Sequence, residues 1–143
     1  MTTIFDVNAQ KLVREAAKEL KKVGLINMPK WANFIKTGSD KQRPPESNDW
    51  WYFRCASLMK TIYKDGPVGI EKLRTKYGGR KNRGAKPSKF RKSGGKVIRT
   101  CLNQLEAAEY IQKEKSGRKI SGKGMSFLDN IAHKIKSDKS GKK

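Results

Sequence analysis

The densest chemical feature of this sequence is a run of positive charges without counter-charges. Between Glu71 and Glu106 the chain carries 12 basic residues and no acidic one, and most of them lie between Arg80 and Lys96. Guanidinium and ammonium groups at this density bind phosphate oxygens and release the counterions condensed on a nucleic acid. The run is rich in glycine and contains Pro87, so it cannot form a core of its own. A solvated, disordered loop is the alternative interpretation.

An aromatic side chain stands inside this run. Phe90 lies between Lys89 and Arg91, where its ring can stack on an unpaired base or pack the loop against the protein. We therefore expect this segment to contact RNA. The candidate contact residues in it are Arg80, Lys81, Arg83, Lys86, Lys89, Phe90, Arg91, Lys92 and Lys96.

Other basic side chains could take part in the same chemistry. Arg54 and Arg99 lie in apolar helical patterns, where each guanidinium could grip phosphate oxygens or instead pair with a carboxylate such as Asp49 or Glu106. Four aromatics surround Arg54 at 50–53, and most belong in a core, with at most one exposed for stacking. A predicted hairpin could touch nucleic acid or be a charged exposed turn, through Lys113, Lys115, Arg118 and Lys119.

The residue types that catalysis and metal binding require are scarce. His133 and the separated Cys55 and Cys101 give neither a zinc ligand set nor a nucleophile and base. The glycine pairs at 78–79 and 94–95 lack the spacing of a P-loop or a dinucleotide fold. We expect no catalytic, metal or cofactor site, and we expect His133 on the surface. The cysteines lie in apolar patterns, which favours buried thiols over a disulfide.

The overall charge agrees with an anionic partner. Thirty-four Lys and Arg against 13 Asp and Glu give a formal charge of +21, far more than solubility requires of a 143-residue chain. The 35% hydrophobic fraction suffices for one modest core. No long apolar run, signal peptide or lipidation motif is present, so we expect a soluble intracellular protein without a membrane partner.

The elements expected to position these residues begin with helices. Asp6 or Asn8 can cap a helix that ends at Gly24, and Asp49 can cap the most apolar segment, 50–63. Two apolar stripes on that segment predict a central helix contacted from several sides. Between these helices, a polar loop at 37–49 follows three residues at helical spacing, Trp31, Phe34 and Ile35.

The second half of the chain combines helices with one predicted hairpin. Helices at 70–77 and 97–108 flank the basic run, as in a helix-turn-helix with an enlarged connection. Strands beginning at Tyr110 and Ile120 enclose a Ser116-Gly117 turn, and Ser121 can cap a last helix. This order predicts a mainly α, winged-helix-related domain with a small β-hairpin and a long basic loop. We expect a single domain over 1–143, with the basic loop at 78–96 and a lysine-rich tail at 136–143.

Three stretches resemble the S19e family of small-subunit ribosomal proteins of eukaryotes and archaea. They are residues 49–57 (DWWYFRCAS), residues 76–84 (KYGGRKNRG) through 87–90 (PSKF), and residues 117–121 (GRKIS) through 128–132 (LDNIA). They keep the family order over nearly the whole chain, and together they are highly specific.

The resemblance implies a winged-helix-related protein in the head of the small (40S) subunit. It implies binding to 18S-type rRNA and its precursor, contact with neighbouring head proteins, and a need for the protein in maturation of that precursor. It further implies a place on cytoplasmic ribosomes after assembly in the nucleolus. The family's RNA-binding surface maps onto Arg54, Lys60, Arg80, Lys81, Arg83, Arg91 and Arg99.

The chain departs from the family pattern at three positions. Lys60 stands where Arg is common, and an ammonium cannot make the bidentate phosphate contact of a guanidinium. Cys55 and Cys101 replace small or aliphatic residues and are expected to remain packing residues.

Composition and element order alone also permit two other functions. A winged-helix DNA regulator or chromatin protein would prefer duplex DNA to structured RNA. A basic enzyme acting on RNA would lose activity with one particular acid or histidine, but no convergent set of such groups is present.

Overall fold

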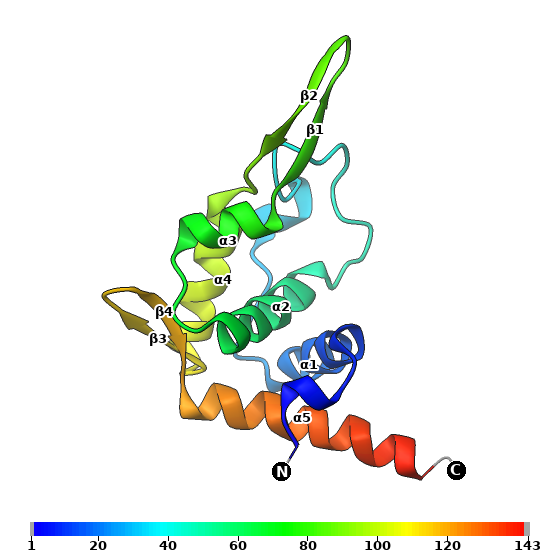
Figure 1. Cartoon of the computed structure of the whole chain (residues 1–143), viewed down its shortest axis with the longest axis vertical. Helices are drawn as coiled ribbons and strands as arrows, with labels where there is room; N and C mark the ends of the chain where they lie inside the picture. Colours follow the sequence, from blue (N-terminus) through cyan, green and yellow to red (C-terminus); the bar gives the residue numbers. More distant parts are fainter. Residues whose placement is uncertain (1, 142–143) are drawn as a thin grey trace.

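The computed structural model describes residues 2–141, which are mainly helical, as predicted (Figure 1). Within these residues there are five α-helices, two 3-10 helices and two antiparallel hairpins. In chain order they are η1 (Ile4–Asp6), α1 (Ala9–Val23), η2 (Lys30–Phe34), α2 (Trp50–Asp65), α3 (Ile70–Tyr77), β1 (Gly79–Arg83), β2 (Lys86–Arg91), α4 (Gly95–Ala107), β3 (Ile111–Glu114), β4 (Gly117–Ile120) and α5 (Gly122–Ser140).

α2 is the helix around which the others pack. α1, α4, α5 and β4 all contact it. Both of its apolar stripes contribute to the core: Trp51, Cys55 and Leu58 are fully buried on one stripe, and Met59 is fully buried on the other. The prediction of a central helix contacted from several sides is therefore confirmed.

Trp51 also connects α2 to α4 and to the chain before η2. Its indole nitrogen donates a hydrogen bond of 2.9 Å to Gln104 Oε1, and Gln104 Nε2 donates one of 2.7 Å to the Asn27 carbonyl. The Trp31 ring meets Trp51 edge-on, with ring centroids 5.7 Å apart. One buried tryptophan thus fixes three segments that are distant in sequence.

The ends of α1 follow the local sequence. Asn8 Oδ1 accepts hydrogen bonds from the Gln10 and Lys11 amides, at 3.0 and 3.3 Å, so Asn8 rather than Asp6 is the cap. Gly24 ends the helix in the left-handed region, at φ +74°.

The expected cap at the start of α2 is wrong. Asp49 occupies the cap position, but its side chain makes no capping hydrogen bond. Its carboxylate instead accepts a 2.9 Å bond from Lys21 Nζ on the neighbouring α1, because packing of the two helices brings this cation within reach.

The β3–β4 hairpin and the capped last helix are confirmed, but the expected start of the return strand is wrong: β4 begins at Gly117 and ends at Ile120, and Gly117 lies in the strand, not in the turn. Glu114 pairs with Gly117, so the turn consists of Lys115 and Ser116. Ser121 Oγ accepts from the Gly124 amide at 3.1 Å and donates to the Glu109 carbonyl at 2.6 Å, which ties the start of α5 to the end of α4.

α5 continues past the point where a tail was expected. It remains helical through Ser140, with exposed side chains from Lys136 onward, and residues 142–143 of the expected tail lie outside the described part of the chain. His133 is exposed on this helix, as predicted.

The two cysteines are free and buried, as predicted. They lie on α2 and α4, and burial together with the neighbouring Cys101 thiol raises the pKa of Cys55 well above its ordinary value. A thiol with a raised pKa stays protonated and unreactive near neutral pH, which suits a packing role.

Replacing Gln104 tests the connection made by Trp51. Gln104→Ala leaves the buried indole N–H without an acceptor, and we expect the free energy of unfolding to fall by about 1–3 kcal/mol in urea denaturation. Asn103→Ala, an exposed neighbour on the same helix, is the matched control and should have little effect. Equal stability of the two variants would contradict the proposed connection.

Candidate nucleic-acid interface

The basic run folds as a second hairpin, so the expectation of a long irregular loop is wrong. β1 and β2 pair antiparallel, with Gly79 opposite Arg91 and Lys81 opposite Lys89. The register shifts between the Lys81–Lys89 pair and the Arg83–Lys86 pair, where β2 has one residue more than β1, which marks a bulge in β2. The strands could not be recognised from the sequence, because they contain no β-branched residue and no buried face. Figure 1 shows the hairpin projecting away from the helices.

Close backbone packing defines the base of this hairpin. A side chain at Gly78 would collide with the Arg91 carbonyl and would lie 2.9 Å from the Phe90 ring. Glycine therefore lets the end of α3 pass directly beneath β2. Phe90 packs over this glycine, yet 50% of its surface remains exposed, so both roles considered for its ring remain open to it.

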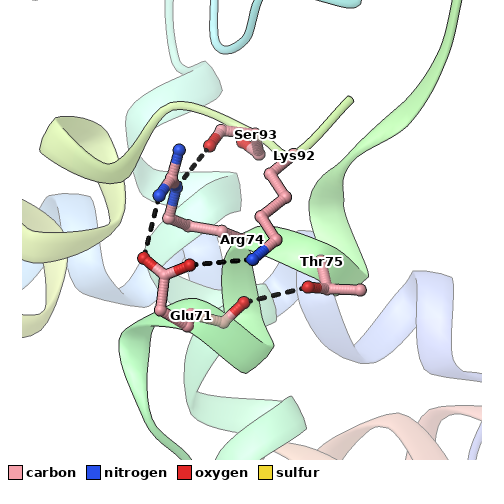
Figure 2. Close-up of polar contacts among 5 residues, drawn as sticks. All are labelled: Glu71, Arg74, Thr75, Lys92 and Ser93. Carbon is pink, nitrogen blue, oxygen red and sulfur yellow. Dashed lines mark hydrogen bonds and ion pairs between the residues drawn. The ribbon is translucent and has the colours of Figure 1, made fainter. Parts of the chain in front are cut away.

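A cluster of polar contacts ties the end of β2 to α3 (Figure 2). The Ser93 amide donates to the Arg74 carbonyl at 3.0 Å, and Arg74 Nε donates to the Ser93 carbonyl at 2.9 Å. Glu71 accepts from Arg74 Nη1 at 2.8 Å and from Lys92 Nζ at 3.0 Å. The hydrogen bonds from Arg74 and then Lys92 lower the pKa of Glu71 below its ordinary value.

The loop after η2 supports the same base from the other side. The Thr37 carbonyl accepts from the Gly94 amide at 2.9 Å and from Ser93 Oγ at 3.0 Å. Asp40 lies nearby with only 3% of its side chain exposed, and its carboxylate leaves no room for a side chain at Gly79. Sequence reasoning missed these supporting residues, because nothing in a polar loop indicates which of its members are buried.

The hairpin presents its cations without partners. Residues 79–91 contain six basic and no acidic side chains. Among residues 2–141, none of these six lies within 4.0 Å of a carboxylate. Lys81 faces Lys89 directly, and Arg91 shares their side of the hairpin because side chains alternate along a strand. Like charges placed opposite each other are destabilising, so the hairpin carries an electrostatic penalty that an anion would relieve.

Three further predicted residues lie near the base of the hairpin. The Arg54 guanidinium stacks on the Tyr77 ring at 4.4 Å, and its Nη1 is buried without a hydrogen-bond partner within the described chain. Lys96 Nζ lies 4.6 Å from the centre of the Trp31 ring, and Arg99 is exposed one turn into α4. We call the basic residues of β1 and β2, with Lys96 and Arg99, the hairpin surface.

The carboxylates considered as partners for the two arginines are engaged elsewhere. Asp49 binds Lys21, and Glu106 Oε2 lies 3.9 Å from Arg118 Nε. Arg118 is half-buried on β4, where its backbone pairs with Val68, and its Nε is buried without a hydrogen-bond partner in the described chain.

The remaining predicted residues are not gathered at the hairpin surface. Lys60 is half-buried on α2 and lines a hollow with Gln10 and Phe53. Lys119 lies 3.7 Å from Glu114 on the β3–β4 hairpin. Lys113 and Lys115 are exposed on that same hairpin. None of the four aromatics at 50–53 is an exposed platform, since Trp50 and Trp51 are buried and the next two are half-buried.

Residues 2–141 offer little support for other kinds of site. Across the described residues, no three His, Cys, Asp or Glu side chains gather as metal ligands would. No helix among them combines the length and the apolar character needed to cross a membrane.

Comparison with known proteins decides the family. Residues 3–138 match the protein family described as Ribosomal protein S19e. The chain belongs to the S19e family. It is 48% identical to the small ribosomal subunit protein eS19 of Aeropyrum pernix over 138 residues, covering 94% of this chain and 90% of that protein.

Further relatives of the S19e family come from both archaea and an animal. The eS19 protein of Haloarcula marismortui is 40% identical over 137 residues, covering 92% of this chain and 90% of that protein. The eS19G protein of Ascaris suum is 38% identical over 139 residues, covering 96% of this chain and 94% of that protein. The resemblance read from the three sequence stretches is thus confirmed.

Removing the charge of Glu71 tests how the hairpin is held. A lowered pKa means that ionised Glu71 stabilises the folded contacts above this pKa and loses that effect as the pH falls through it. We expect Glu71→Gln to speed amide hydrogen exchange in residues 79–93 at neutral pH. In the variant, the protection of these amides should also change less as the pH is lowered into the acidic range. Glu46→Gln, at an exposed position in the loop before α2, is the control. Identical exchange in both variants would mean that Glu71 does not hold the hairpin.

Proposed function

We propose that this chain is a structural, non-catalytic constituent of the small ribosomal subunit that binds rRNA through the hairpin surface. Membership of the S19e family supports the ribosomal role, because the relatives named above are small-subunit proteins. The observation that carries the RNA contact is the projecting hairpin with six cations, of which Lys81 and Lys89 face each other.

Phosphate binding accounts for this arrangement better than folding does. The hairpin buries no apolar face, and its cations repel one another across the strands. RNA phosphates neutralise such charges and release counterions, so binding removes a penalty that the free protein carries. The hydrogen bonds of Ser93 with Arg74 and Thr37 hold the hairpin in a fixed direction. Phosphate contacts of the hairpin therefore also set the orientation of the protein on the RNA.

The start of α4 extends the phosphate-binding surface. Gly94 provides no side-chain cap, so the first amides of this helix remain without a side-chain acceptor. Arg99 lies beside Gly95, where its Nη2 would be 3.0 Å from an added Cβ. Backbone amides and a guanidinium together suit a phosphate. Arg54, whose guanidinium stacks on Tyr77 near the base, can provide a second contact there through its other nitrogens.

The order of elements supports a winged-helix-related arrangement. α3 and α4 correspond to the two helices of a helix-turn-helix with the β1–β2 hairpin as its enlarged connection, and β3–β4 corresponds to the wing. Within this proposal, Arg118 and Lys119 of the wing make a secondary contact. The protein occupies the head of the subunit beside other head proteins, serves maturation of the rRNA precursor, and resides on cytoplasmic ribosomes after nucleolar assembly.

Gradient sedimentation tests the proposal directly. In extract of cells expressing the tagged chain, we expect it to sediment with small subunits at low salt and to dissociate partly as salt rises. Absence from the small-subunit fraction at low salt would overturn the proposal. Competition between duplex DNA and rRNA for the purified chain provides a second test, since retention on DNA under excess rRNA would indicate a DNA regulator instead.

Charge removal on one face of the hairpin gives a quantitative prediction. Lys81→Ala with Lys89→Ala should reduce the slope of log affinity against log salt for small-subunit rRNA by about 2, about one for each lost phosphate contact. Lys134→Ala with Lys136→Ala removes the same charge from α5, at the far end of the molecule from the hairpin (Figure 1), and should change the slope less. Equal slopes for the two double variants would contradict the assignment of this face.

A further inference from the structure

Phe34 is the most exposed large apolar side chain among residues 2–141, with 85% of its surface open to solvent. A single exposed apolar residue is ordinary on a protein surface. Phe34 differs from the others in its surroundings. Phe5 has an aromatic neighbour, since its ring lies edge-on to Tyr63, and Phe90 covers Gly78.

The backbone that carries Phe34 is fixed on both sides. Before it, Trp31 packs edge-on against Trp51, and Ala32 is buried. After it, the Thr37 carbonyl is bound by Ser93 and Gly94 at the end of the hairpin. A ring on such a support loses little conformational entropy when a ligand stacks on it.

The charges around Phe34 select a ligand that is both aromatic and anionic. Residues 24–39 contain two lysines, Lys30 and Lys36, which flank the ring in sequence, and no acidic residue. Lys96 of the hairpin surface lies over Trp31 of the same 3-10 helix, at 4.6 Å. Figure 1 shows η2, in light blue, beside the base of the hairpin and the start of α4. The 3-10 helix that carries Phe34 therefore adjoins the proposed phosphate contacts.

We propose that Phe34 is a stacking platform for one unpaired RNA base, flanked by phosphates bound to Lys30, Lys36 and Lys96. Nucleotides combine a flat aromatic base with a phosphate, and base stacking on an aromatic side chain is a frequent way of holding unpaired nucleotides. The inference rests on the proposed RNA-binding function and deepens it. It gives the chain a preference for RNA with an unpaired base, whereas the hairpin cations bind phosphates without regard to pairing.

The test uses the full-length protein and three blunt-ended RNA duplexes of matched length. One duplex contains a single bulged adenosine, the second has an abasic residue at the bulge, and the third is uninterrupted. We expect the protein to prefer the adenosine bulge. In fluorescence anisotropy titrations, Phe34→Ala should weaken binding to the adenosine bulge by about 5- to 150-fold, the range that loss of one stacked base produces. Binding to the other two duplexes should change little.

Two substitutions at the same position separate stacking from apolar contact. Phe34→Tyr keeps a flat ring and should retain the preference, whereas Phe34→Leu keeps apolar volume without a ring and should lose it. Phe5→Ala removes an exposed phenylalanine from η1 and serves as the matched control, with unchanged binding expected. Circular dichroism of each variant verifies that the fold is retained.

Each contrary result has its own meaning. Equal binding of the adenosine bulge by the wild-type protein and Phe34→Ala would overturn the stacking inference and leave the hairpin surface unaffected. Unchanged RNA binding with impaired sedimentation of Phe34→Ala with small subunits would also overturn it, and would point to a protein contact. Failure of the wild-type protein to bind any of the three RNAs at physiological ionic strength would instead count against the proposed function itself.

Discussion

Burial of α2 is the constraint on which the rest of the structure depends. Trp51 is completely enclosed, and its single polar atom is satisfied only through Gln104, which in turn binds the chain before η2. Helices α1, α4 and α5 are arranged by their contacts with this one helix. The apolar side chains of a 143-residue chain suffice for one such centre, so the elements beyond it have to be held by polar contacts instead.

The hairpin surface is an example of this second kind of support. Glu71, Arg74, Ser93 and Thr37 hold its base through hydrogen bonds and ion pairs, while its strands extend into solvent. The few carboxylates near the base are consumed in this support: Glu71 binds two cations, and Asp40 pairs with Lys41 beneath Gly79. The acidic groups thus serve the attachment of the hairpin and leave the outer cations available to another molecule.

The sequence predicted the parts of the fold that follow from local patterns. The apolar stripes of α1, α2, α4 and α5, the glycine after α1 and the Ser121 cap all depend on residues within a few turns of one another. Two of the failed expectations, the Asp49 cap and the basic loop, have a different cause. Asp49 found a long-range partner in Lys21, and the β1–β2 strands lack the alternating apolar residues that identify a strand. The first outcome depends on a contact between residues 28 apart in sequence, and the second on a local hairpin whose residue types do not mark its strands.

The candidate site was predictable to a similar degree. Its cations were evident from composition, and Arg54, Lys96 and Arg99 do lie beside the basic run. Their separation from Lys60 and Lys119 was not evident, because it depends on the directions in which α2 and β4 present these side chains. The exposure of Phe34 was not evident either, because helical spacing from Trp31 does not show that Trp31 packs against Trp51 while the Phe34 ring lies in solvent.

The bulge in β2, between Lys86 and Lys89, affects the shape of any ligand that covers the hairpin. An extra residue in one strand bends it and increases its local twist. The pair formed by Arg83 and Lys86, beyond the shift, is therefore rotated relative to the pair formed by Lys81 and Lys89 before it. A straight row of phosphates can follow only one of these pairs, so a backbone that reaches both has to wind around the hairpin.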